Sequence, residues 1–370
     1  MQQIASGSTV SPAPLRPLGA LRFGLAVLVM IHHFAVELGS PAMVAAVAPR
    51  VPGDVAVMAF FILSGFIIFE AVGTFYAGRP LAFLANRLLR IVPPFLAALV
   101  VAVLIHAAIY LATGRLYRID GRPLDAGIFA PANLLANLFD IVPGIGFFGQ
   151  QPAYEFLWLA WTLRVELLFY AAVFLATGAV ALARGRGTLA HRAGIAWAVL
   201  AALLLPLGML AVLGYAPNSL QFAPYFIFGA AFYLWDDGRR RAGWVALLCL
   251  PLIAIQFWNY NAGFFAAHLP RDRAGHYALL ALCVAIFVLL ARRRATHLPA
   301  WDRWLGDLSY PIYLNHLAVG VAWQSLGAPP GWTAVILGMA ASVALAQLMH
   351  WLVESRVKPW RDALRGRALA

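Results

Sequence analysis

The segment from Pro93 to Thr113, PPFLAALVVAVLIHAAIYLAT, contains no Asp, Glu, Lys or Arg. A helix of about twenty apolar residues is long enough to cross the ~30 Å hydrocarbon core of a bilayer. The sequence therefore predicts an all-α polytopic membrane protein with about ten transmembrane helices. Because one of the runs is short, nine to eleven spans also fit the pattern. The other nine apolar runs lie at residues 18–38, 51–72, 156–182, 194–214, 222–236, 243–260, 275–291, 307–326 and 332–353.

The composition excludes a water-soluble globule of this length. Of 370 residues, 63% are hydrophobic and 11% are charged, whereas soluble domains average roughly 45–50% and about 25%. The net charge of +12 comes largely from Arg residues in short clusters between the apolar runs. This arrangement is typical of cytoplasmic loops and argues against a nucleic-acid partner, which would require one basic face. Cys249 and Cys283 lie inside apolar runs, so no disulfide framework is expected.

The distribution of basic residues predicts the orientation of the chain. With a cytoplasmic N-terminus, 19 of the 27 Lys and Arg residues fall in inside segments, 6 fall in outside segments, and two, Arg22 and Arg164, lie within spans. This bias predicts that the N- and C-termini are both cytoplasmic. The chain then divides into a cytoplasmic N-terminal segment (1–17), a membrane domain (18–353) and a basic cytoplasmic tail (354–370). The outside segment 114–155 is long enough to fold over an outer cavity, although an inert loop fits it equally well.

Ionisable residues inside the first span form a polar stripe. Arg22 and His33 are eleven residues apart, which places them within about 20° of one helical face and about 16 Å apart along it. A guanidinium near the cytoplasmic mouth suits a phosphate-bearing ligand, and an imidazole higher up can move a proton near neutral pH. Glu37, one turn beyond His33, is in register to hold its ring, whereas His32 points about 80° away from Arg22. A proton relay or a helix-packing hydrogen bond remains the alternative.

Further polar residues lie within or beside other spans, where each charge costs at least ~2.5–3.5 kcal/mol at the bilayer centre. Glu166 is the clearest functional candidate, and an ion pair with Arg164 or with an Arg of another helix is its alternative. Ser64 precedes Gly65, which by itself indicates only a close helix contact. Arg87 and Arg90 by themselves form an ordinary cytoplasmic anchor. The remaining candidates for a polar cavity are Trp161, Ser309, Tyr313 and His316, of which the last three share one helical face.

Taken in order, these segments resemble acyltransferase family three, the membrane O-acyltransferases of bacterial glycans, Nod factors and macrolides. Departures at Met58, Thr162, Arg164 and Asn315 leave Arg22 and His33 untouched. The matching elements are the Arg and His separated by ten residues (Arg22, His33), FFxLSGF (Phe60–Phe66), RxxRIxPP (Arg87–Pro94), WSLxVExxFY (Trp161–Tyr170) and GxxSYxxYLxH (Gly306–His316).

The resemblance implies transfer of an acyl group, most often acetyl from acetyl-CoA, to a hydroxyl of a saccharide or glycoside in the bacterial cytoplasmic membrane. It implies that Arg22 binds the CoA phosphates with help from Arg87 and Arg90, and that His33 is the general base or a transient acyl carrier. Glu166 would orient a base or balance Arg164. No metal is expected, and a homodimer is left open. The residues expected to line the substrate cavity are Ser64, Glu37, Trp161, Arg164, Ser309, Tyr313 and His316.

A secondary transporter or flippase is the main rival, because the same polar residues would line a permeation path. The sequence shows neither two related halves nor paired spans broken by Gly or Pro, which argues against it. The acceptor, the acyl chain length and the choice between direct and covalent transfer stay open from the sequence.

Overall fold

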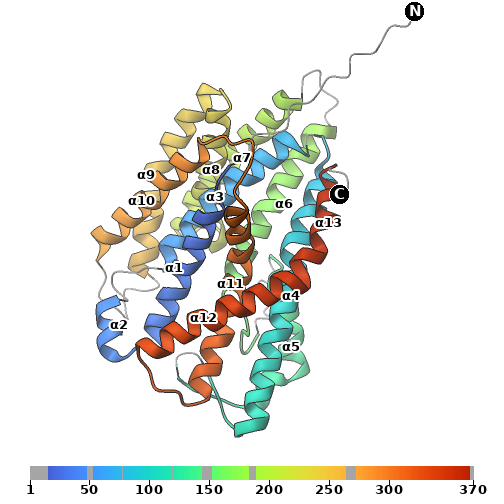
Figure 1. The fold of residues 1–370 in the computed structure, drawn as a ribbon. Coiled ribbons are helices and arrows are strands. Elements are labelled where there is room, and N and C mark those ends of the chain that lie inside the picture. Colours follow the sequence, from blue (N-terminus) through green and yellow to red (C-terminus); the bar gives the residue numbers. More distant parts are fainter. Residues whose placement is uncertain are drawn as a thin grey trace, which may run out of the picture.

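A computed structural model of the chain describes residues 16–47, 53–76, 78–118, 121–143, 152–182, 189–263 and 272–366. These segments fold into a bundle of long helices (Figure 1). A single two-stranded antiparallel pair joins β1 (Leu116–Tyr117) to β2 (Pro123–Leu124) in the described part. The helices are α1 (Gly19–Glu37), α2 (Pro41–Val47), α3 (Gly53–Thr74), α4 (Pro80–Thr113), α5 (Pro131–Leu138), α6 (Ala160–Leu182), α7 (Leu189–Val212), α8 (Ala223–Asp236), α9 (Arg240–Gly263), α10 (Arg273–Ala291), α11 (Ala300–Ser325), α12 (Trp332–Met349) and α13 (Ser355–Leu364).

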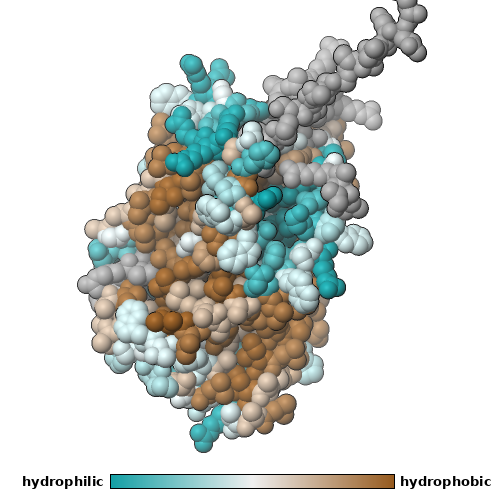
Figure 2. Space-filling view, viewed as in Figure 1, coloured by the Kyte–Doolittle hydropathy of each residue, from teal (hydrophilic) through white to brown (hydrophobic). Residues whose placement is uncertain are grey.

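The all-α membrane architecture predicted from the sequence is confirmed. Among the described residues, eight helical segments are long and apolar enough to cross a membrane. Two further helices cover the other runs predicted as spans: α8, with 14 residues, and α11, with 26. Hydrophobic side chains cover most of the face seen in Figure 2, and hydrophilic ones gather toward the end of the bundle where α13 lies. The figure of ten spans stays a prediction.

Helix α4 begins earlier than the apolar run that predicted it. The sequence placed Arg87 and Arg90 in front of a span starting at Pro93, but α4 begins at Pro80 and continues through Pro93 and Pro94. An interior proline removes one backbone hydrogen bond, and membrane helices tolerate this where neighbouring helices and local adjustments compensate for it. Both arginines are therefore held on a rigid helix instead of in a loop.

The C-terminal region is also helical where a tail was predicted. A short π-helical segment, η4 (His350–Glu354), joins α12 to α13. Such π segments bend helices, and in Figure 1 the chain changes direction between α12 and α13. The turn buries Glu354, which is 8% exposed, and leads α13 back along α4.

The FFxLSGF element lies where α3 packs closely on α8. A Cβ atom on Gly65 would lie 2.0 Å from the carbonyl oxygen of Phe226, and one on Gly229 would lie 1.9 Å from that of Ile62. No other residue allows the two backbones to approach this closely. The glycines therefore fix the position of α3 against α8. Ser64, the residue before Gly65, lies on the face of α3 next to this contact.

The start of α1 is fixed by α11. The carboxylate of Asp302 accepts hydrogen bonds from the backbone N–H groups of Gly19 (3.3 Å) and Ala20 (2.9 Å). These are two of the N–H groups that a helix N-terminus leaves without partners. Arg22 follows one turn later, so this cap sets its height in the bundle.

The two ends of the described chain lie at the same end of the bundle. Arg16 binds Glu70 of α3 (2.7 Å) and Asp236 of α8 (3.2 Å), while Arg365 lies over the ring of Phe75, just after α3. The compartment that this end faces stays a prediction from the charge distribution.

At the opposite end, the described parts of the segment predicted as an outer loop pack together. The side chains of Asn133 and Asn137, on α5, bind the backbone of Tyr154 and Phe156 at distances of 2.8–3.2 Å. The Tyr154 hydroxyl also lies 2.9 Å from Nε2 of His106 on α4. These bonds tie the segment that enters α6 to the end of α4.

Candidate active site

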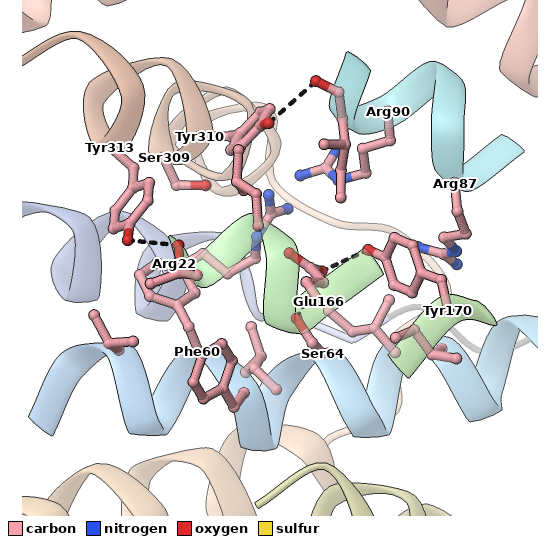
Figure 3. A pocket seen from close by; sticks show the side chains of 18 of the residues that line it. Arg22, Phe60, Ser64, Arg87, Arg90, Glu166, Tyr170, Ser309, Tyr310 and Tyr313 are labelled. Carbon is pink, nitrogen blue, oxygen red and sulfur yellow. Dashed lines mark hydrogen bonds between the residues drawn. The ribbon is translucent and has the colours of Figure 1, made fainter. Parts of the chain in front are cut away.

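An elongated cavity lies among α1, α3, α4, α6, α11 and α13. Its α3 wall runs from Val57 to Ile68, a distance of about 16 Å along a helix. One wall is mostly apolar, and the others carry arginine, tyrosine and hydroxyl side chains (Figure 3). The lining residues are Arg22, Val57, Phe60, Phe61, Leu63, Ser64, Ile67, Ile68, Arg87, Arg90, Ile91, Thr162, Leu163, Glu166, Tyr170, Ser309, Tyr310, Tyr313, Arg361 and Arg365.

The structure brings together the three arginines that the sequence singled out for the donor. Arg22 reaches the cavity from α1, and Arg87 and Arg90 reach it from α4 (Figure 3). Within the described segments, none of the three forms an ion pair with a carboxylate. Arg87 instead lies 5.7 Å from the ring centroid of Phe83 and 5.8 Å from that of Tyr170. Guanidinium groups held without a carboxylate partner suit an anionic ligand.

Glu166 lies in the same cavity and is held by two hydroxyl groups. Ser64 donates to its Oε1 from α3 (3.1 Å), and Tyr170 donates to the same oxygen from one turn further along α6 (2.5 Å). Figure 3 shows the carboxylate between these two residues. The carboxylate is thereby fixed within the arginine-lined space and faces α3.

An ion pair of Glu166 with Arg164, one of the alternatives that the sequence left open, is not formed. Arg164 binds Asp140, and its other guanidinium nitrogen lies 4.0 Å from Glu155. Residues two apart on a helix point about 160° away from each other, so Arg164 faces the outer cap and does not line the cavity. Burial raises the pKa of the Asp140 and Glu155 carboxyls, and the charge of Arg164 opposes that shift at both.

His33 pairs with His316 and does not itself line the cavity. The two rings are stacked with centroids 5.1 Å apart, and Nδ1 of His33 lies 2.8 Å from Nε2 of His316. On its other side, the His33 ring contacts Trp158 at the entry to α6 (5.6 Å). The sequence placed Glu37 in register to hold the His33 ring. In the structure, the backbone carbonyl of Glu37 accepts a hydrogen bond from Gln324.

The hydrogen bonds of this pair assign the protons of both rings. Nδ1 of His316 lies 2.9 Å from the carbonyl oxygen of Ile312, and a carbonyl can only accept. A neutral His316 therefore carries its proton on Nδ1 and accepts at Nε2. His33 must then donate from its own Nδ1, which leaves its Nε2 with a free lone pair. This is the tautomer that a general base needs.

A thin layer of side chains separates the cavity from His33. The hydroxyl of Tyr313 lies 2.8 Å from that of Thr162, and the Tyr313 ring packs edge-on against Phe60. All three residues line the cavity, and Tyr313 also contacts the His316 ring on the other side, at 6.4 Å. The arginines and His33 therefore lie on opposite sides of this layer.

The remaining candidates from the sequence divide between the cavity and the packing around it. Ser309 lines the cavity, and its hydroxyl donates to the carbonyl of Gly306 (2.7 Å). Trp161 lies outside the lining and packs against Phe61 and Phe222. Trp161 thus supports the apolar wall from behind.

Three residues that line the cavity, Arg361, Arg365 and Tyr310, are not among the site residues predicted from the sequence. Arg361 and Arg365 belonged to the predicted basic tail, where charge alone gave no reason to place them in the site. Their spacing of four residues, which puts them on one helical face, was the available signal. Tyr310, whose hydroxyl donates to the carbonyl of Ile91 (3.2 Å), was likewise not assigned a role.

Residues 18–351 match a protein-family model described as an acyltransferase domain. The match covers the helices from α1 to the beginning of η4 and all the cavity residues except Arg361 and Arg365. No curated protein and no solved structure matches this chain.

Proposed function

The chain belongs to the acyltransferase domain family, and from this membership we propose that it moves an acetyl or other short acyl group from acyl-CoA to a hydroxyl of a saccharide or glycosylated acceptor. Membership of the family and the long apolar helices together identify the chain as a membrane acyltransferase. The bacterial cytoplasmic membrane is the proposed location.

The observation that supports this proposal most strongly is the pairing of an arginine-lined cavity with a histidine of fixed tautomer. Acyl-CoA carries its phosphates at one end and its thioester at the other. Arg22, Arg87 and Arg90 can bind the phosphates from the cytoplasmic end. The thioester would then lie toward Tyr313 and Thr162, the side of the cavity that is nearer to His33 and His316.

The chemical step assigned to His33 is proton transfer. Its Nε2 accepts the proton of the acceptor hydroxyl, and the oxygen attacks the carbonyl carbon of the thioester. The new C–O bond forms as the C–S bond breaks, and the proton on Nε2 passes to the departing thiolate. Glu166 holds the hydroxyls of Ser64 and Tyr170 in place, where they line the path of the donor.

Transfer across the layer formed by Tyr313, Thr162 and Phe60 requires that the layer open during turnover. The hydrogen bond between Tyr313 and Thr162 is one neutral contact, which contributes about 1 kcal/mol, and the packing of the Tyr313 ring against Phe60 adds to the cost of opening. The outer side of His33 faces Trp158, which is 40% exposed. A saccharide is proposed to approach from there.

Two measurements test the proposal. Purified protein in lipid nanodiscs should release free CoA from acetyl-CoA when extracts of surface glycans are added. Mass spectrometry of the surface glycans of a deletion strain should show the loss of an acyl ester that complementation restores. Unchanged glycans together with the loss of uptake of a solute would favour the transporter alternative.

A further inference from the structure

The C-terminal helix α13 contributes two arginines to the cavity. Arg361 and Arg365 are one turn apart and both line it. The helix is fastened to the first turns of α4, because Asn86 donates to the carbonyl of Arg361 (2.7 Å) and Arg79 donates to that of Leu364 (3.2 Å). The two guanidinium groups are therefore positioned by tertiary contacts and do not belong to a free tail.

The positive charges of Arg361, Arg365 and Arg87 are poorly compensated by negative groups nearby. Arg87 is 4% exposed, and its electrostatic neighbours are Arg90, Arg365 and tyrosine hydroxyls. In the described part of the chain, the Nε atoms of Arg87, Arg361 and Arg365 are buried without a hydrogen-bond partner. The ion pair of Arg365 with Asp362 (3.3 Å) is shared, because Asp362 also binds Lys358 (3.1 Å).

The arginines nearer to the centre of the cavity have a different environment. The charges of Asp307, Glu354 and Glu166 act on Arg22 and Arg90, although none of these carboxylates forms an ion pair with them in the described part of the chain. Of the three, Glu354 alone also acts on Arg361. Burying an unpaired cation is costly unless a counter-charge arrives with the ligand. The greatest need for an anion is thus at the end of the cavity formed by Arg87, Arg361 and Arg365.

This end is the one farther from His33. Arg365 lies over Phe75, which follows the last residue of α3, whereas Tyr313 packs against Phe60 near the beginning of that helix. Phe60 and Phe75 are fifteen residues apart in the sequence, or roughly 22 Å along a helix. A donor with its thioester toward His33 would extend its nucleotide end toward α13.

We propose that Arg361 and Arg365 of α13, together with Arg87, bind the 3′-phosphate of the acyl-CoA donor, which is the phosphate at its nucleotide end. The inference rests on the proposed function. Arg22 and Arg90 are then left for the diphosphate between the nucleotide and the pantetheine arm. A phosphomonoester carries close to two negative charges near neutral pH, which suits three converging guanidiniums.

The test measures the binding of two ligands to the wild-type protein and to each variant. CoA and dephospho-CoA, which lacks the 3′-phosphate, are titrated calorimetrically into the full-length protein in phosphatidylcholine nanodiscs. Wild type should bind CoA about tenfold or more tightly than dephospho-CoA. In Arg361→Ala and Arg365→Ala that preference should largely disappear, because the affinity for CoA falls while that for dephospho-CoA stays. Such non-additivity reports a direct contact.

Arg356→Ala is the matched control, since Arg356 is exposed on the same helix and does not line the cavity. It should keep the wild-type preference. The unchanged affinity for dephospho-CoA shows that a variant is folded, and Arg361→Lys and Arg365→Lys provide milder substitutions that should retain part of the preference.

Two results would overturn the inference. One is a wild-type preference for CoA that persists in both alanine variants. The other is a wild-type protein that binds CoA and dephospho-CoA equally well. In either case, poorer retention of phosphatidylglycerol by the alanine variants during purification would identify the bound phosphate as that of a lipid headgroup. A wild-type protein that binds neither ligand would instead remove the CoA donor and the proposed function with it.

Discussion

Nδ1 of His33 lies 2.8 Å from Nε2 of His316, and the far nitrogen of His316 is fixed by the carbonyl of Ile312. This chain of two hydrogen bonds connects α1 to α11 and leaves Nε2 of His33 as a free acceptor. His33 and His316 are 283 residues apart, so only the folded bundle creates the arrangement.

The first prediction concerns the base itself. His33→Ala should lower acyl transfer by about 10²–10⁴-fold, the usual contribution of general acid–base catalysis, and should leave CoA binding intact. His32→Ala is the control. The His32 ring contacts His33 edge-on, but His32 takes no part in the proposed proton transfer. Transferase assays on both variants in nanodiscs check the prediction. Full activity in His33→Ala would remove His33 from the chemistry.

The second prediction treats His316 as a positioning residue. His316→Leu leaves the buried Nδ1–H of His33 without an acceptor, at a cost of about 1–3 kcal/mol, so the rate should fall roughly 5–150-fold. His316→Gln should recover part of it, because its side-chain oxygen can accept the same proton. ¹⁵N NMR of labelled histidine should show the Nδ1–H form of His33 in wild type and a mixture in His316→Leu. An unaltered tautomer there would contradict this role.

The third prediction separates charge from geometry at Arg22. Arg22→Ala should weaken CoA binding by about tenfold or more, since a hydrogen bond to a charged group contributes about 1.5–3 kcal/mol. Arg22→Lys should rescue binding only in part, because a single ammonium lacks the paired donors of a guanidinium. Calorimetric titration with CoA measures both. Equal affinity in wild type and Arg22→Ala would exclude Arg22 from the donor site.

The fourth prediction concerns packing between α3 and α8. Gly65→Ala places a Cβ atom 2.0 Å from a backbone carbonyl oxygen, and overpacking of this kind costs about 1–3 kcal/mol or more. The thermal midpoint in detergent should fall by several degrees. Gly178→Ala on α6 is the control, because nothing lies within 4 Å of its Cβ position. Equal midpoints for the two variants would show that the close contact is absent.

The fifth prediction is the orientation of the bundle. Reporter fusions after Gly238 and after Ala370 should both report the cytoplasm, as the 19-to-6 distribution of basic residues indicates. An external signal at Ala370 would mean that the number of spans between the two positions is odd, and the ten-span arrangement would be wrong.

The sequence by itself determined the class of the fold and several residues of the cavity. Apolar runs longer than twenty residues have one stable outcome in a bilayer, where each backbone polar group must be satisfied within its own helix. Charges inside such runs are expensive, which is why Arg22 and Glu166 stand out without any structure. The motifs also located Ser64, Arg87, Arg90 and Tyr313, all of which line the cavity.

The tertiary structure alone decided which of these groups meet. Helical periodicity relates residues within one helix, and it gives no information on which face of another helix lies opposite. The partner of His33 is thus His316 on α11, Arg164 turns outward to Asp140 and Glu155, and Glu166 receives hydroxyls from α3 and α6. Arg361 and Arg365 enter the cavity because a π segment turns α13 onto α4. Such contacts depend on the packing of distant helices, which local sequence patterns do not encode.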